Sequence, residues 1–89
     1  MNWQHLNLAV ANQRGVHGRV ATRLAEIAAE YGVRLQIIRG EETVECSSIL
    51  DVLALALVQG TEIRLCAHGE KAKEALQAAR AVIASQDEP

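Results

Sequence analysis

One short stretch of the chain carries the residues best suited to chemistry. Residues 14–23 read RGVHGRVATR and place three arginines around one histidine, His17, while no Asp or Glu occurs in the first twenty-five positions. A neutral imidazole can act as a nucleophile, and guanidinium groups bind anions through charge-assisted hydrogen bonds. The stretch therefore predicts an anion site at His17, with three candidate anion-binding residues: Arg14, Arg19 and Arg23.

A predicted helix follows the histidine directly. Apolar residues recur at helical spacing from Gly18 to Tyr31, and Gly32 follows as a typical C-terminal stop. His17 would then lie at the N-cap, where free backbone N–H groups and the positive end of the helix dipole disfavour an imidazolium. The same groups would bind a phosphate carried by the ring, and Gly18 leaves the approach to His17 open.

The arginines also have a purely structural interpretation. Arg19 and Arg23 lie four residues apart on one helix face, where two cations repel each other and oppose the dipole until an anion arrives. Alternatively, His17 is a solvated loop residue, and Arg23 pairs with Glu26 or Glu30 on its own helix. The residues alone leave both interpretations open.

The rest of the chain predicts the elements that would position this site. Alternating apolar residues predict four strands, at 5–11, 33–39, 43–46 and 61–67. Further helices are predicted at 47–60 and 70–85; Ser48 and Asp51 form a capping-box pattern, and Gly60 would end the first of these helices. The order βαββαβα predicts an α+β open-faced sandwich, a four-stranded antiparallel sheet with three helices on one face, in a single domain over residues 1–89.

Composition and cysteine usage narrow the class of protein. The formal net charge of -2 gives no argument for binding to nucleic acid, no apolar run could be inserted in a membrane, and the N-terminus lacks a secretory signal. Cys46 and Cys66 show no CxxC spacing, so we expect reduced thiols in a cytoplasmic monomer, with Cys46 buried or inert. His5, Cys66 and His68 could share one sheet face, but zinc spacing is absent, and we expect no metal or cofactor.

The residues around the histidine match a known motif. Gly15–Ala21 (GVHGRVA) resembles the active-site pattern G-[LI]-H-A-R-P-A of the HPr family, the phosphocarrier proteins of the bacterial sugar phosphotransferase system. The resemblance implies that His17 accepts a phosphoryl group on Nδ1 from phosphorylated enzyme I, ultimately from phosphoenolpyruvate, and passes it to IIA domains. It also implies that Arg19 neutralises the phosphate and that no cofactor is needed.

A second family motif lies at the start of the next predicted helix. Ser48, Ile49 and Leu50 resemble the family's serine followed by an apolar pair, and QGTEI (59–63) and HGEKAKEAL (68–76) continue the match in register. The resemblance implies a regulatory serine for an ATP-dependent HPr kinase, and a partner-docking patch at Ile49 and Leu50. The alternatives are that Ser48 only caps its helix and that one of the two apolar residues packs inward.

The chain also departs from the family pattern. Val20 stands where the family has Pro, Gly18 where it has Ala, and Ser47 where it has Lys. The first two changes would loosen the first helical turn, and the third removes a cation from the docking surface, for which Arg14 would compensate. These departures favour a regulatory or nitrogen-related phosphorelay over sugar uptake.

Three functions remain open at this point. The first is a phosphocarrier acting through His17. The second is a regulatory protein on the same fold, which binds its partner through Ser48, Ile49 and Leu50 and has no use for His17 and Arg19. The third is a small-ligand-binding domain with an apolar pocket. The chain lacks a Gly-rich phosphate loop, which argues against a kinase or ATPase.

Overall fold

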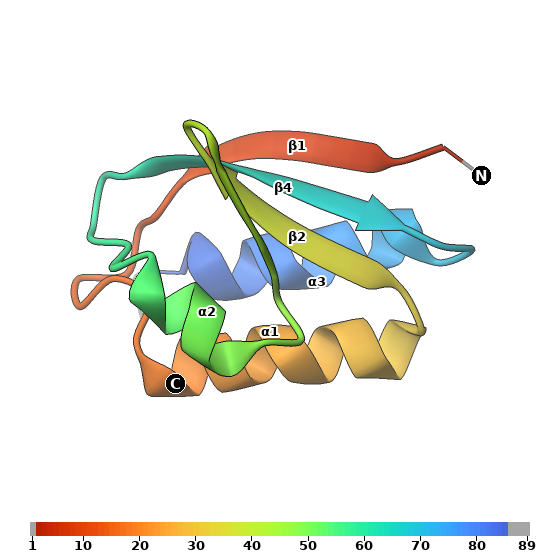
Figure 1. The fold of residues 1–89 in the computed structure, drawn as a ribbon, viewed down its shortest axis with the longest axis horizontal. Helices are drawn as coiled ribbons and strands as arrows, with labels where there is room; N and C mark the ends of the chain where they lie inside the picture. Colours follow the sequence, from red (N-terminus) through yellow and green to blue (C-terminus); the bar gives the residue numbers. More distant parts are fainter. Residues whose placement is uncertain (1, 86–89) are drawn as a thin grey trace.

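The computed structural model describes residues 2–85. Its four strands and three helices follow one another in the predicted order, and the helices cover one face of the sheet (Figure 1). The strands are β1 (Gln4–Ala9), β2 (Arg34–Arg39), β3 (Glu42–Glu45) and β4 (Glu62–His68), and the helices are α1 (Gly18–Tyr31), α2 (Ile49–Ala54) and α3 (Ala72–Ile83). The sheet order is β1-β4-β2-β3 with antiparallel neighbours throughout, so the predicted open-faced sandwich is confirmed.

The register of the sheet separates an apolar face from a polar one. Leu65 of β4 pairs with Leu6 on one side and Ile37 on the other, and all three side chains belong to the core beneath the helices. The next residue, Cys66, pairs with His5, and both lie on the opposite face because successive side chains of a strand alternate. The predicted alternation along these strands is thus confirmed.

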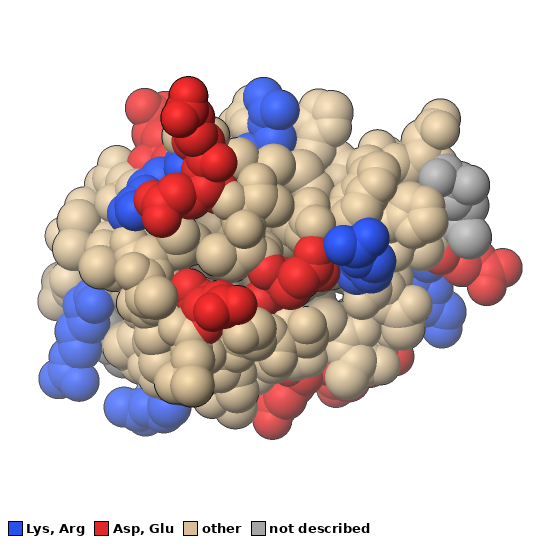
Figure 2. Space-filling model, in the orientation of Figure 1, with Lys and Arg blue, Asp and Glu red and all other residues tan. Residues whose placement is uncertain are grey.

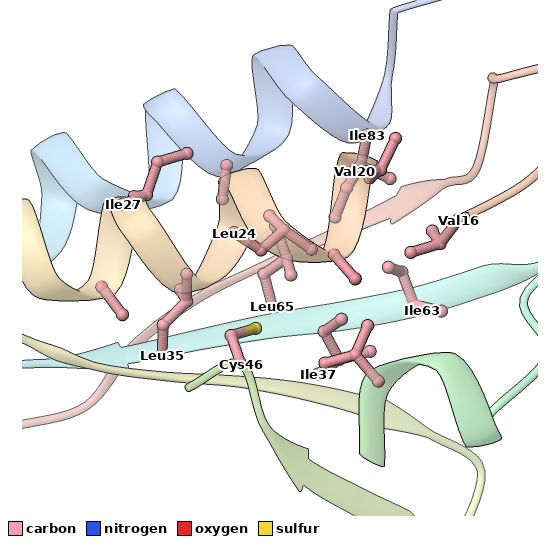
Figure 3. Close-up of a cluster of buried hydrophobic side chains, with 14 of the residues drawn as sticks. Val16, Val20, Leu24, Ile27, Leu35, Ile37, Cys46, Ile63, Leu65 and Ile83 are labelled. Carbon is pink, nitrogen blue, oxygen red and sulfur yellow. The ribbon is translucent and has the colours of Figure 1, made fainter. Parts of the chain in front are cut away.

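An aliphatic core fills the space between the sheet and the helices. In the view of Figure 3, Ile83 near the end of α3 lies over Val20 in the first turn of α1, and Leu65 points toward Leu24. Cys46 is fully buried here, as predicted; burial, with a contribution from the Glu45 charge, raises the pKa of its thiol to about 12. This thiol is therefore an inert packing group.

Helix α2 is much shorter than the sequence predicted. It ends at Ala54, whereas the predicted helix continued to Gly60. Leu55 and Leu57 are both buried on either side of Ala56, which has a φ of 51°. In a continuous helix these two side chains would point to nearly opposite sides. The chain turns out of the helix here instead: Leu55 still has right-handed helical angles, whereas Ala56 has a positive φ.

The predicted capping interactions of α2 are also absent. Ser48 is the N-cap residue, but its side chain makes no capping hydrogen bond, so the predicted capping box with Asp51 is wrong. Gly60 lies instead in the turn before β4, where its N–H donates to the carbonyl of Val10 at 2.8 Å. By contrast, the predicted stop of α1 at Gly32 is confirmed, with a φ of 63°.

Candidate functional site

His17 occupies the predicted N-cap of α1. Its backbone is extended, with φ -103° and ψ -173°, and its Nδ1 atom accepts a hydrogen bond from the backbone N–H of Arg19 at 3.3 Å. A ring nitrogen that accepts this bond carries a lone pair rather than a proton. The half-buried imidazole therefore presents the lone pair of Nδ1 at the positive end of the helix.

The first turn of α1 is open and basic. Gly18 and Arg19 are exposed, a Cβ at Gly18 would meet no atom within 4 Å, and the turn has no acidic residue. Figure 2 shows basic side chains projecting from the end of the molecule where α1 begins, whereas acidic side chains gather over the hairpin of β2 and β3. An anion at His17 would meet the N–H groups of a first helical turn that contains no acidic residue, and the guanidinium of Arg19 belongs to the same turn.

The structure does not bring Arg23 to this site. Its Nη1 atom lies 2.9 Å from a carboxylate oxygen of Glu30 and 3.4 Å from one of Glu26. Glu30 is more than three helical turns beyond His17, so these ion pairs direct the guanidinium away from the histidine. Arg23 is thus a helix-surface residue here, which is the alternative that the sequence left open.

The loop between β1 and α1 (residues 10–17, here called the His17 loop) is held by a close contact between Gly15 and the segment after α2. Gly15 has a φ of 70°, and a Cβ built on it would lie 2.1 Å from the carbonyl oxygen of Leu57. The next residue, Val16, donates its N–H to that same oxygen at 2.9 Å. Glycine is therefore required both for the backbone conformation and for the close approach. Arg14 is exposed in the turn just before it.

Two exposed apolar side chains lie on α2 and on the segment that follows it. Ile49 packs against the core, whereas Leu50 is 79% exposed, so one member of the predicted docking pair does pack inward. Val58 is 64% exposed and directly follows Leu57, the contact of the loop. Sequence reasoning missed Val58 because it placed this residue inside a helix, although the alternation of buried Leu55 and Leu57 indicates an outward position for Val58.

The residues suggested as a metal site do not form one. Among residues 2–85, no group of three or more His, Cys, Asp and Glu side chains could hold a metal ion. Instead, the ring of His68 lies 5.2 Å from that of Trp3, centroid to centroid, on the open face of the sheet. The described part of the chain also has no helix long and apolar enough to span a bilayer.

Comparison with known proteins places this site in a family. The family described as PTS HPr component phosphorylation site matches residues 5–85. Phosphocarrier protein NPr of Shewanella violacea is 34% identical over 76 residues, covering 85% of this chain and 84% of the relative. Phosphocarrier protein HPr of Mycoplasma capricolum is 36% identical over 69 residues, 78% of each chain. The crystal structure of a phosphocarrier protein HPr from Bacillus anthracis superposes with a TM-score of 0.84 at 26% identity, covering 91% of this chain and 96% of that one.

Proposed function

The chain belongs to the HPr family of phosphocarrier proteins, and on that premise we propose that it accepts a phosphoryl group on His17 from phosphorylated enzyme I and passes it to IIA-type acceptors. One observation carries the proposal: Nδ1 of His17 accepts a hydrogen bond from the Arg19 N–H at the start of α1. The nucleophilic lone pair is thus directed to the end of a helix where an anion is stabilised. The role implies the cytoplasm, where phosphoenolpyruvate is available, and a monomer.

The transfer exchanges one bond to phosphorus for another. A bond forms between Nδ1 and the phosphorus atom while the bond from phosphorus to the donor atom of enzyme I breaks, and its electron pair stays on that donor. Nδ1 can then no longer accept the N–H of Arg19, which instead donates to a phosphoryl oxygen. Passing the group to an acceptor reverses these changes, so His17 is a transient covalent carrier.

The groups around His17 are more favourably placed with a phosphoryl dianion bound than without one. The first turn of α1 has no carboxylate, Gly18 adds no bulk, and the guanidinium of Arg19 supplies a positive charge. Arg14 adds a second cation from the preceding turn. Such groups stabilise charge on the phosphoryl oxygens without taking part in bond making or breaking.

Partner docking is proposed at the neighbouring apolar residues. Leu50 and Val58 are the large exposed apolar side chains of α2, which packs against α1, and of the segment after α2, which contacts the His17 loop. With Arg14 and Arg19 at the margin, they form an apolar centre with a basic rim, which suits brief contacts with acidic surfaces of enzyme I and IIA domains.

The test is phosphorylation by enzyme I in the presence of phosphoenolpyruvate. We expect intact-mass spectrometry to detect one acid-labile phosphoryl group on the wild type and none on His17→Ala. His5→Ala is the matched control because it removes an exposed histidine on the open sheet face, and it should be phosphorylated normally. Absence of the adduct on wild type, with a cognate enzyme I that phosphorylates another carrier, would refute the proposal.

A second candidate is a regulatory HPr-like protein that acts through phosphorylation of Ser48. The observation that favours it is the absence of a capping hydrogen bond from the Ser48 side chain, so that a phosphate there displaces no cap. An HPr kinase/phosphorylase with ATP should then label wild type but not Ser48→Ala, and the label should survive acid. Labelling of His17→Ala at the normal rate would separate this function from the carrier function.

A further inference from the structure

One polar side chain lies inside the core next to the His17 loop. Asn12 is the only buried polar residue among residues 2–85, with no exposed surface. Its Nδ2 atom donates to the carbonyl of Ser85 at 2.6 Å and to that of Val82 at 3.4 Å. These two carbonyls lie in the last turn of α3 and just beyond it, so the side chain connects positions 70 and 73 residues apart in sequence.

The amide caps the end of a helix from outside that helix. Carbonyls in the last turn of a helix have no partner within it and need another donor. A second bond reinforces the junction, since the N–H of Ala11 donates to the carbonyl of Ile83 at 3.1 Å. Asn12 and Ala11 thus clasp the start of the His17 loop to the C-terminal end of α3.

The clasp is made at a cost in free energy. The Oδ1 atom of Asn12 is buried and has no hydrogen-bond partner. The amide cannot relieve this by rotation, because Oδ1 would then face two carbonyl oxygens. An unsatisfied buried acceptor destabilises the folded state. Burying an apolar side chain of similar shape at this position would avoid that cost in free energy, but it would also lose the hydrogen bonds to α3.

The backbone connects the clasp to the histidine in a few residues. The carbonyl of Asn12 accepts the N–H of Gly15 at 3.0 Å, which closes a turn, and Val16 is then tied to Leu57. His17 follows immediately as the N-cap of α1. The loop therefore has two attachments, one to the segment after α2 and one, through Asn12, to the end of α3.

We propose that Asn12 is a positioning residue for phosphoryl transfer: its amide clasps the His17 loop to the end of α3 and so fixes the orientation of the imidazole at the N-cap. This inference rests on the proposed carrier function of His17. It means that a displacement of the end of α3 is transmitted through the loop to the orientation of the His17 ring.

The test compares Asn12→Leu with Leu76→Val in the full chain. Leu76 is buried in α3 several residues before the clasp, so its shortening lowers stability without touching the loop. We expect Asn12→Leu to slow phosphoryl transfer from enzyme I by about three- to tenfold, because small misplacements of a reacting group are costly. It should also shift the NMR signals of the Arg19 amide and of the His17 ring nitrogens, whereas Leu76→Val should leave rate and signals unchanged at an equal or larger fall in melting temperature.

The outcomes separate this inference from the proposed function. Unchanged ring and amide signals in Asn12→Leu, or changed signals with a wild-type transfer rate, would overturn the positioning role. If enzyme I does not phosphorylate the wild type, the carrier function is refuted. The NMR comparison of Asn12→Leu with wild type still tests the clasp in that case, because unchanged signals in the variant would refute it. If Asn12→Leu does not fold, Asn12→Ala provides the same comparison. It also removes the amide, and it leaves a small cavity instead of introducing an apolar side chain.

Discussion

The hydrogen bond from the Arg19 N–H holds the lone pair of His17 Nδ1 at the N-terminus of α1. At 3.3 Å it is longer than the usual 2.9–3.0 Å of an N–H to acceptor bond, so its loss costs little free energy. A phosphoryl oxygen bonded at Nδ1 can take over this N–H as a stronger, charged acceptor. On the proposed carrier function, this N–H would therefore stabilise the phosphorylated state more than the free one.

The two arginines of α1 should differ in their importance for transfer. We expect Arg19→Ala to lower the rate of phosphorylation of His17 by about tenfold to a hundredfold, because a charge-stabilising donor is lost. Arg23→Ala should change the rate by less than about twofold, since its ion pairs with Glu26 and Glu30 lie on the helix surface and contribute little. Quench-flow measurement of phosphorylation by enzyme I compares the two variants. Equal effects on the rate would contradict this prediction and show that Arg23 acts at the site.

The two glycines of the motif should respond in opposite directions to alanine. Gly15→Ala introduces a Cβ 2.1 Å from the carbonyl oxygen of Leu57 at a φ of 70°, and should lower the free energy of unfolding by about 2–4 kcal/mol. Gly18→Ala meets open space on a helix and should raise it by about 0.5–1 kcal/mol. Urea denaturation of both variants checks this pair, and a stable Gly15→Ala would show that the loop can move away from Leu57.

At the scale of elements, the segment just after α2 contains a strained backbone conformation that a substitution can relieve. Ala56 adopts a φ of 51°, a region where a Cβ crowds the backbone. Ala56→Gly should therefore raise the free energy of unfolding by about 0.5–1 kcal/mol, the strain relieved less the extra entropy of glycine in the unfolded chain. Thermal denaturation checks the sign, and Ala54→Gly, at the last helical residue of α2, should lower the melting temperature under the same conditions.

The elements that the sequence predicted well are those with one consistent period. The helical spacing of Val20, Leu24 and Ile27 leads from an N-cap at His17 to a stop at Gly32, and the structure agrees at both ends. The alternation of β4 was equally clear over its first half, where Glu62 and Arg64 are exposed on either side of the buried Ile63. A local pattern is sufficient where neighbouring residues face chemically different surroundings.

The remainder depended on contacts that a local pattern does not contain. The run LALAL (53–57) does not indicate where helix α2 ends, and in the structure it ends within this run, at Ala54. The close approach of the Leu57 carbonyl to Gly15 is a contact distant in sequence that the local pattern does not contain. The sequence likewise indicated no role for Asn12, whose partners follow 70 and 73 residues later. The sequence thus predicted which residues form the His17 loop, but not the contacts with Leu57 and with the end of α3 that hold it in place.

The short edge strand β3 should depend on pH through Glu45. Partial burial raises the pKa of Glu45, but hydrogen bonds from Arg34 and Gln36 together outweigh it, and the net pKa is lowered from 4.5. A lowered pKa in the folded state stabilises the protein above the unfolded value and loses this contribution as pH falls below it. We expect the melting temperature of Glu45→Gln to fall less steeply below pH 4.5 than that of the wild type.

A second variant tests the origin of this effect. Arg34→Gln removes the guanidinium that lies 2.8 Å from the Glu45 carboxylate but keeps the strand residue polar. It should flatten the same part of the curve, because the interaction that lowers the pKa is lost. A wild-type slope in both variants would contradict the assignment to this pair.

At the scale of the whole molecule, the end that carries the His17 loop differs in charge from the β2–β3 hairpin. The His17 loop and the start of α1 expose Arg14 and Arg19 although the chain carries a formal net charge of -2, and acidic side chains gather at the β2–β3 hairpin (Figure 2). Leu50 and Val58 are exposed beside the basic end. A partner with an acidic, partly apolar surface would therefore approach from this end and not from the hairpin.

Docking should consequently be separable from folding. Leu50→Ser and Val58→Ser remove exposed apolar area that contributes little to the core, so each should change the free energy of unfolding by less than about 0.5 kcal/mol. If both side chains contact enzyme I, each variant should raise the KM for transfer by about three- to tenfold, the range for moderately important interface residues. Steady-state phosphorylation at varied carrier concentration measures this effect.

Trp3→Ser provides the control for loss of apolar surface as such. Trp3 is 39% exposed and precedes β1, whereas the His17 loop follows the other end of that strand, about 20 Å away for six residues. Its removal disrupts the contacts with His68 and Arg34, so stability should fall while the KM stays at the wild-type value. A raised KM for Trp3→Ser with normal values for Leu50→Ser and Val58→Ser would move the docking surface to the open face of the sheet, and the charge separation would then have no part in partner choice.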